Sequence, residues 1–184
     1  MRLPTLTTPR LLLRPLTAAD VPAVFAACSD PRLTTFTLFD THRTPDDTTA
    51  FLVGYALPSY AAGTPDPFGI TWKEAPDEVI GCCGAFPVAD EPGVYECGYW
   101  VRVADWGKGV ATEAAGELVR FVSAGYPCER LRARVLVGNG ASEAVLRKLG
   151  FAEQPGRVSV TRRGRAEAAK VFTAAVRSPA GSPP

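Results

Sequence analysis

The stretch ECGYWVRVADWGKGVATEA, residues 96–114, decides the fold. Residues 96–101 have the aromatic and β-branched content of a strand, and a loop with Gly107 and Gly109 follows. Apolar residues then recur at helical spacing at Ala111, Ala115, Leu118 and Val122. A strand that enters a helix through a glycine loop directs successive backbone N–H groups, and the positive end of the helix dipole, at one point. The stretch therefore predicts a phosphate-binding turn.

The glycine pattern of this turn differs from two familiar phosphate loops. Lys108 is not followed by Ser or Thr and the Walker spacing is absent, so a nucleoside triphosphatase loop fits poorly. The Gly-x-Gly-x-x-Gly order of a dinucleotide fold is also missing. Because a bare Gly-x-Gly pair is common in ordinary turns, the surrounding elements must decide what the loop does.

The residues before this stretch predict two helices and a sheet. A strand at 10–16 leads into Thr17, which with Asp20 forms a capping box for a helix to about residue 29. Thr44 and Pro45 open a second helix through residue 56. Strands are predicted at residues 68–73, 79–86 and 94–101, and the segment 74–77 supplies a hairpin turn.

After the stretch, helices and strands continue to alternate. The helix from 111 to about 125 turns Glu113, Glu117 and Arg120 outward. A strand at 131–137 alternates apolar residues with Arg132 and Arg134, a helix at 141–149 stops at Gly150, and strands follow at 158–161 and 171–173. We expect an α/β fold, a mixed sheet of about seven strands with helices on both faces, in a single domain over residues 1–177. The Pro/Ser/Gly-rich segment 178–184 is predicted to be a flexible tail.

Composition narrows the class of protein. The formal net charge of the 184 residues is +1, which gives no field to attract nucleic acid or an anionic membrane. No run approaches the ~18 apolar residues of a membrane span, and we expect a cytoplasmic location. A single histidine and five cysteines without a Cys-x-x-Cys pair predict no metal site, no Ser-His-Asp triad and reduced core thiols.

The stretch also resembles a known family. Residues 106–111 look like the acetyl-CoA pyrophosphate loop of GNAT acetyltransferases, and the similarity extends to residues 96–100, 111–114, 139–142 and 145–151. Together these motifs resemble the branch of ribosomal-protein N-terminal acetyltransferases (RimJ/RimL-like), over roughly residues 8–176. The resemblance implies the GNAT fold, a mostly antiparallel sheet in which the fourth and fifth strands splay apart.

The resemblance also implies the cofactor, acetyl-CoA, and the residues that bind it. In the family the pantetheine arm lies in the splay against the fourth strand, and the pyrophosphate lies on the glycine loop. Asn139 corresponds to a side chain that contacts the pantetheine arm, although Asn also favours a turn before a helix. The implied cofactor-binding set is Val101, Val103, Trp106, Gly107, Lys108, Gly109, Val110, Ala111, Thr112 and Asn139.

Acetyl transfer by direct attack, without a covalent enzyme intermediate, needs a neutral amine, a polarised thioester and a proton for the thiolate. Glu96 is the candidate base; its alternatives are an exposed strand residue and a structural hydrogen-bond partner for a loop. A backbone N–H near Val101 would polarise the carbonyl. The tyrosine that protonates the thiolate in many relatives is replaced here by Leu146. Ser142 is the candidate acid, and its alternative is a plain residue of the first helical turn.

The sequence says less about the amine that accepts the acetyl group. Arg157, Arg162, Arg163 and Arg165 flank the last predicted hairpin, where they would select an acidic substrate, contact RNA or form a solvated basic hairpin. We expect a primary amine on a peptide or a small molecule. A non-catalytic acyl-CoA-binding sensor and a nucleotide-binding protein remain as alternatives, and the sequence leaves a homodimer open.

Overall fold

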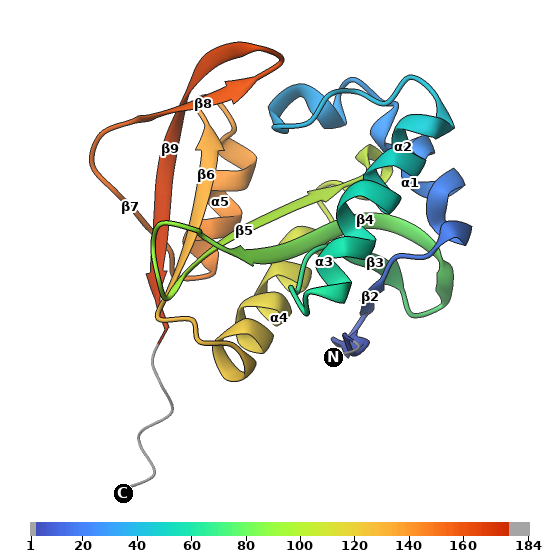
Figure 1. The fold of residues 1–184 in the computed structure, drawn as a ribbon, viewed down its shortest axis with the longest axis horizontal. Coiled ribbons are helices and arrows are strands. Elements are labelled where there is room, and N and C mark those ends of the chain that lie inside the picture. The colour runs from blue at the N-terminus through green and yellow to red at the C-terminus, as the bar shows by residue number, and fades with distance from the viewer. Residues whose placement is uncertain (1–2, 177–184) are drawn as a thin grey trace, which may run out of the picture.

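The computed structural model describes residues 3–176, whose strands form one nine-stranded sheet (Figure 1). The strands are β1 (Leu6–Thr7), β2 (Leu11–Pro15), β3 (Phe68–Trp72), β4 (Ala75–Pro87), β5 (Val94–Val101), β6 (Arg130–Leu136), β7 (Ala152–Glu153), β8 (Val158–Arg162) and β9 (Arg165–Ala175). Their order is β1-β2-β3-β4-β5-β6-β9-β7, with β8 paired to β9. Every pairing is antiparallel except that of β5 with β6.

Helices cover both faces of this sheet. They are η1 (Ala18–Asp20), α1 (Val21–Cys28), η2 (Leu33–Phe36), α2 (Pro45–Phe51), η3 (Leu52–Ala56), α3 (Leu57–Ala61), η4 (Val103–Asp105), α4 (Val110–Gly125) and α5 (Gly140–Lys148); η3 is a π-helical segment and the other three η segments are 3₁₀ turns. Helix α4 packs Leu118 and Val122 into the main core. The other face, around Val79 and Cys82, packs against α1 and η3.

The sheet opens between β5 and β6, as the GNAT resemblance predicts. Only three residue pairs join the two strands, and the last of them is Glu96 with Arg132. Beyond this pair the strands diverge toward their carboxyl ends (Figure 1), while β6 stays paired with β9 along its whole length. The splay therefore lies between residues 97–101 of β5 and residues 133–136 of β6.

The main elements agree with the sequence predictions, and the differences have simple causes. β1 and β7 went unpredicted because two residues carry no periodic signal. β9 begins at Arg165 rather than at residue 171, because small residues in its first half still pair with β8. β4 begins at Ala75, so the hairpin turn before it is shorter than predicted. The predicted tail, 178–184, lies outside the described residues.

Two of the three charged residues of α4 predicted to face outward are only partly exposed, since the side chains of Glu113 and Glu117 are 17% and 11% exposed. The Glu113 carboxylate accepts hydrogen bonds from the Thr8 hydroxyl (2.6 Å) and from the Arg10 backbone (2.9 Å) and side chain (2.7 Å). Burial alone would raise the Glu113 pKa, but these donors outweigh burial and lower it. The outward placement of Glu113 was wrong because the N-terminal segment packs over the start of α4.

Candidate active site

The predicted phosphate-binding turn is present at the start of α4. Gly107 and Gly109 have φ angles of 74° and 79°, a left-handed conformation that residues with a Cβ adopt at a cost. Gly109 is the N-cap residue and no side chain caps the helix. The N–H groups of the first turn, Val110 to Thr112, therefore have no side-chain cap, and a phosphate is the kind of group such a terminus binds.

A buried carboxylate braces this turn. Asp105 is 3% exposed and accepts hydrogen bonds from Lys108 Nζ (2.8 Å), from the Arg102 guanidinium and from the Trp72 indole (3.3 Å). Burial alone would raise the Asp105 pKa, but the two cations outweigh burial and lower it. Asp105 thus stays charged and holds Lys108 beside the turn.

The edge of β5 supplies backbone groups to the splay. Because the Arg102 N–H donates to the Ile80 carbonyl (2.8 Å), ladder alternation turns the N–H groups of Val101 and Tyr99 away from β4 and into the splay. The Val101 carbonyl accepts from the indole N–H of Trp106 (2.7 Å). The strand ends at Val101, so Val103, another member of the implied cofactor-binding set, begins η4 and does not belong to this edge.

A hydroxyl pair crosses the splay from β5 to α5. The Tyr99 hydroxyl lies 3.0 Å from Ser142 Oγ and donates to the Ser142 carbonyl (3.2 Å). Burial raises the pKa of Tyr99 to about 12, although the hydrogen bond with Ser142 acts in the opposite direction. Asn139 Oδ1 accepts from the Ser142 N–H (3.2 Å), so Asn139 caps α5. Leu146, the position of the usual tyrosine, is buried in the core.

Glu96 lies at the base of the splay with both carboxylate oxygens engaged. It is 5% exposed, and Oε2 accepts from Arg132 Nη2 (2.7 Å) while Oε1 accepts from Arg134 Nε (2.6 Å). The alternative that Glu96 is an exposed strand residue is therefore wrong, and its hydrogen-bond partners lie on β6 rather than in a loop. Its role as a base stays a prediction.

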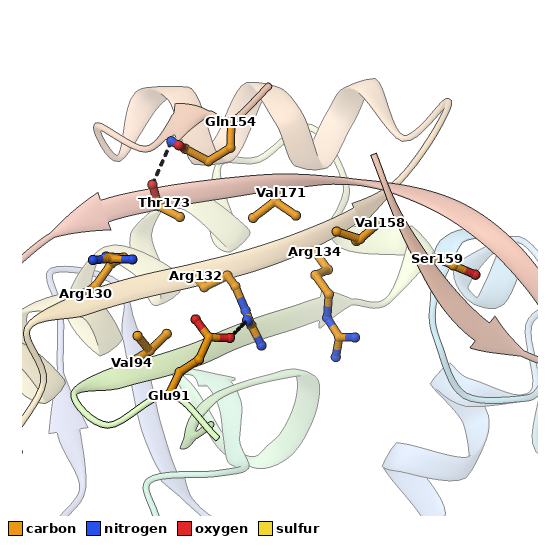
Figure 2. A pocket seen from close by; sticks show the side chains of 10 residues that line it. All are labelled: Glu91, Val94, Arg130, Arg132, Arg134, Gln154, Val158, Ser159, Val171 and Thr173. Carbon is orange, nitrogen blue, oxygen red and sulfur yellow. Dashed lines mark hydrogen bonds and ion pairs between the residues drawn. The ribbon is translucent and has the colours of Figure 1, made fainter. Parts of the chain in front are cut away.

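Arginines line a cavity on the sheet face opposite α4 (Figure 2). Its volume is about 560 Å³. The lining residues are Glu91, Val94, Arg130, Arg132, Arg134, Gln154, Val158, Ser159, Val171 and Thr173. We call this cavity the arginine pocket. Arg132 and Arg134 alternate with the core residues of β6 as predicted, but their convergence on Glu96 required the β5–β6 register.

The four arginines of the last hairpin do not form a uniformly solvated group. Arg157, Arg163 and Arg165 are exposed as predicted, but Arg162 is only 8% exposed. The Arg162 guanidinium donates to the carbonyls of Thr34 (2.8 Å), Thr35 (2.8 Å) and Thr37 (2.7 Å) and pairs with Glu167. Arg162 therefore ties the β8–β9 hairpin to the η2 segment, a contact between residues at least 125 positions apart.

The sequence did not predict Asp66, which like Glu96 is a buried carboxylate on the arginine-pocket face of the sheet. Asp66 is 8% exposed, accepts a hydrogen bond from the Tyr55 hydroxyl, and lies against Gly84 of β4. A Cβ on Gly84 would lie 1.7 Å from Asp66 Oδ1, so only glycine fits there. Burial raises the Asp66 pKa. Since Gly84 pairs with Gly98 of β5, Asp66 lies one strand away from the splay.

The cysteines are buried, as predicted. All five have free thiols, and burial raises the pKa of Cys97 to about 12, so this thiol is protonated at neutral pH. Within residues 3–176, no three His, Cys, Asp or Glu side chains gather as metal ligands. None of the helices in that range combines the length and apolar character needed to cross a bilayer.

Comparison with known proteins reveals relatives in sequence and fold. A family model described as an acetyltransferase (GNAT) domain matches residues 10–152. The uncharacterized N-acetyltransferase p20 of Bacillus licheniformis is 32% identical over 153 residues, 82% of this chain and 83% of that protein. An acetyltransferase structure from Agrobacterium tumefaciens str. C58 has 27% identity and a TM-score of 0.73 over 95% of both chains. RimL, a ribosomal L7/L12 alpha-N-protein acetyltransferase solved with coenzyme A, has 18% identity and a TM-score of 0.80, covering 94% of this chain and 98% of that one.

Proposed function

Because this chain belongs to the GNAT acetyltransferase family and is an acetyl-CoA-dependent acyltransferase, we propose that it acetylates a primary amine bound at the arginine-pocket side of the splay. The observation that carries the proposal is the splay itself. β5 and β6 separate beside the uncapped start of α4, so a chain-like donor has a groove between the strands and an anion site at its end.

The residues of the turn fit the pyrophosphate of acetyl-CoA. Left-handed Gly107 and Gly109 let the backbone approach closely, the first-turn N–H groups lack a cap, and Lys108 adds a positive charge. When bound, acetyl-CoA supplies an activated acetyl thioester. The proposed contacts are Val101, Trp106, Gly107, Lys108, Gly109, Val110, Ala111, Thr112 and Asn139, with Val103 acting only through the shape of η4.

The residues around the splay support direct attack by the amine. The Val101 N–H, directed into the splay, would stabilise negative charge on the carbonyl oxygen. The described nucleophilic thiols are buried and, for Cys97, protonated, which favours a route without a covalent enzyme intermediate.

The Tyr99–Ser142 pair fits the role of proton donor to the departing sulfur. Tyr99 holds Ser142 Oγ in the first turn of α5, one turn before Leu146, which occupies the position of the usual catalytic tyrosine. Because the Tyr99 pKa is about 12, its hydroxyl keeps its proton at neutral pH and can hold or resupply that of Ser142. Ser142 is the proposed acid and Tyr99 its positioning residue.

Glu96 remains the proposed base, acting through water. A free α-amine with a pKa near 7.8 costs only about 1 kcal/mol to deprotonate at pH 7, so a weak base is sufficient. Asp66 is the competing carboxylate on the same face, and burial already favours its protonated form. Changing each to its amide separates them, because only the true base should remove the acid limb of the pH profile of kcat/KM.

A thermal-shift titration with acetyl-CoA, CoA, ATP and NAD tests the function. Acetyl-CoA at 100 times its Kd should add about 2.7 kcal/mol of stability, or roughly 5–10 °C in Tm for a chain of this size. A response to ATP or NAD alone would contradict the proposal. Release of free thiol with an amine then separates an enzyme from an acyl-CoA-binding sensor, since Glu96→Gln should slow turnover in an enzyme and leave acetyl-CoA binding intact.

A further inference from the structure

None of the residues proposed to contact acetyl-CoA lines the arginine pocket. Arg130, Arg132 and Arg134 share one face of β6 because the residues between them, Leu131 and Ala133, face the core. The cavity beside them, about 560 Å³, is in the range of small-molecule sites, roughly 300–1,000 Å³. The three arginines follow one another along β6 in this cavity (Figure 2).

The pocket keeps a positive charge after its internal pairs are counted. Three arginines face two carboxylates, those of Glu91 and Glu96, which leaves one positive charge. Arg132 binds both carboxylates, whereas Arg134 uses only its Nε. Within residues 3–176 the terminal nitrogens of Arg134 have no acceptor, and the side chain of Arg130 has neither a hydrogen bond nor an ion pair.

The position of Arg134 links this charge to the reaction. Arg132 is the last residue of β6 paired with β5, and Arg134 lies two residues further, about 7 Å along the strand. Arg134 therefore stands at the edge of the splay, on the face where β5 presents Gly98 and Trp100. Glu96 holds the Arg134 Nε at 2.6 Å, which orients the guanidinium and leaves its outer edge to the pocket.

We propose that the acceptor amine carries an anionic group, a carboxylate or a phosphate, which binds the outer edge of Arg134. This inference rests on the proposed acetyltransferase function. A guanidinium fork matches either anion through paired, charge-assisted hydrogen bonds. The hydroxyls of Ser159 and Thr173 line the same pocket and can add contacts to the anion, whereas the Gln154 amide already donates to Thr173 Oγ1 (2.8 Å) and to the Ala152 carbonyl (3.2 Å).

Matched acceptors test this specificity. Thiol release from acetyl-CoA is measured with amino acids against their carboxamides, and with aminoalkyl phosphates against the corresponding amino alcohols. We expect kcat/KM at least tenfold higher for the anionic member of the preferred pair. Arg134→Gln should raise KM for that member about tenfold and leave KM for the neutral member unchanged. Because Arg134 also pairs with Glu96, kcat can change in this variant, but it should change equally for both members. Arg134→Lys should recover part of the preference, and acetyl-CoA binding should not change in either variant.

The control is Arg120→Gln, which removes one positive charge from an exposed, Glu117-paired arginine of α4 and should not alter the preference. The same pairs are also compared by thermal shift with saturating CoA, so binding is read without turnover. The proposal would be overturned if charged and neutral members had equal kcat/KM and gave equal thermal shifts. It would also be overturned if Arg134→Gln kept the preference for the anionic member. Failure of acetyl-CoA to stabilise the protein would instead overturn the acetyltransferase function.

Discussion

The two sides of the splay are built in different ways. On the cofactor side, the residues that would meet the phosphates are consecutive, 106–112, and act mainly through backbone groups. On the acceptor side, the charged groups come from β5, β6 and the last hairpin and act through side chains. The Glu96–Arg134 pair spans 38 positions and the Arg162–Thr37 contact spans 125.

This difference has a functional meaning. A backbone site tolerates changes in most side chains, which suits a donor that the whole family shares. A side-chain site changes with single substitutions, which suits acceptors that differ between family members. If the comparison is right, variants on the two sides should fail in different ways.

The largest expected effect is a loss of stability when Arg162, which joins the β8–β9 hairpin to the η2 segment, is replaced. Arg162→Ala removes the buried guanidinium and leaves its four acceptors without that donor, which should lower the free energy of unfolding by about 3 kcal/mol. Urea denaturation measures this. Arg163→Ala is the control, because Arg163 is 44% exposed at its side chain and should cost under about 1 kcal/mol. If both variants lost the same free energy of unfolding, the Arg162 contacts would add little stability.

The hydroxyl pair should affect turnover more than folding. Ser142→Ala is expected to lower kcat about 100-fold, and Tyr99→Phe about tenfold, with acetyl-CoA affinity preserved. The double variant should be less than additive, since Tyr99 acts through Ser142. Tyr126→Phe is the control, because it also removes one tyrosine hydrogen bond, to the Gly63 carbonyl. Unchanged kcat in Ser142→Ala would remove Ser142 from the mechanism.

On the cofactor side, backbone conformation should matter most. Gly107→Ala and Gly63→Ala place a Cβ at nearly equal φ angles, 74° and 73°, with open space around each. Both should cost about 1 kcal/mol of stability. Only Gly107→Ala should weaken acetyl-CoA binding, by tenfold or more, in a calorimetric titration. Equal affinities in the two variants would show that the turn does not contact the cofactor.

The smallest effect concerns Asp66 and pH. The folded-state pKa of Asp66 is raised by burial, so its contribution to stability is present below its unfolded value of 3.8 and is lost as pH rises through the folded value. Asp66→Asn, which keeps an acceptor for Tyr55, should therefore gain stability relative to the unchanged protein as pH rises from about 4 to 7. Urea midpoints across this range measure the difference, and a constant difference would show that burial does not control this carboxyl.

The sequence determined most of the fold and the cofactor side by itself. Residues 94–101 form a strand, residues 110–125 a helix, and the glycines between them adopt left-handed conformations, because each of these features depends on neighbours close in the chain. The seven predicted strands are present within the nine described, and the two additional ones are too short for a periodic pattern.

Only the tertiary structure decided the acceptor side. Alternation placed Arg132 and Arg134 on one face of their strand, but the register of β5 against β6 brought them to Glu96. No local pattern joins Tyr99 to Ser142, Asp66 to Gly84, or Arg162 to the η2 carbonyls. Each of these contacts depends on how the elements pack in three dimensions. The physical reason is that a side chain contacts whatever lies near it in space, whereas the helices, strands and turns predicted here depend mainly on residues close in the chain.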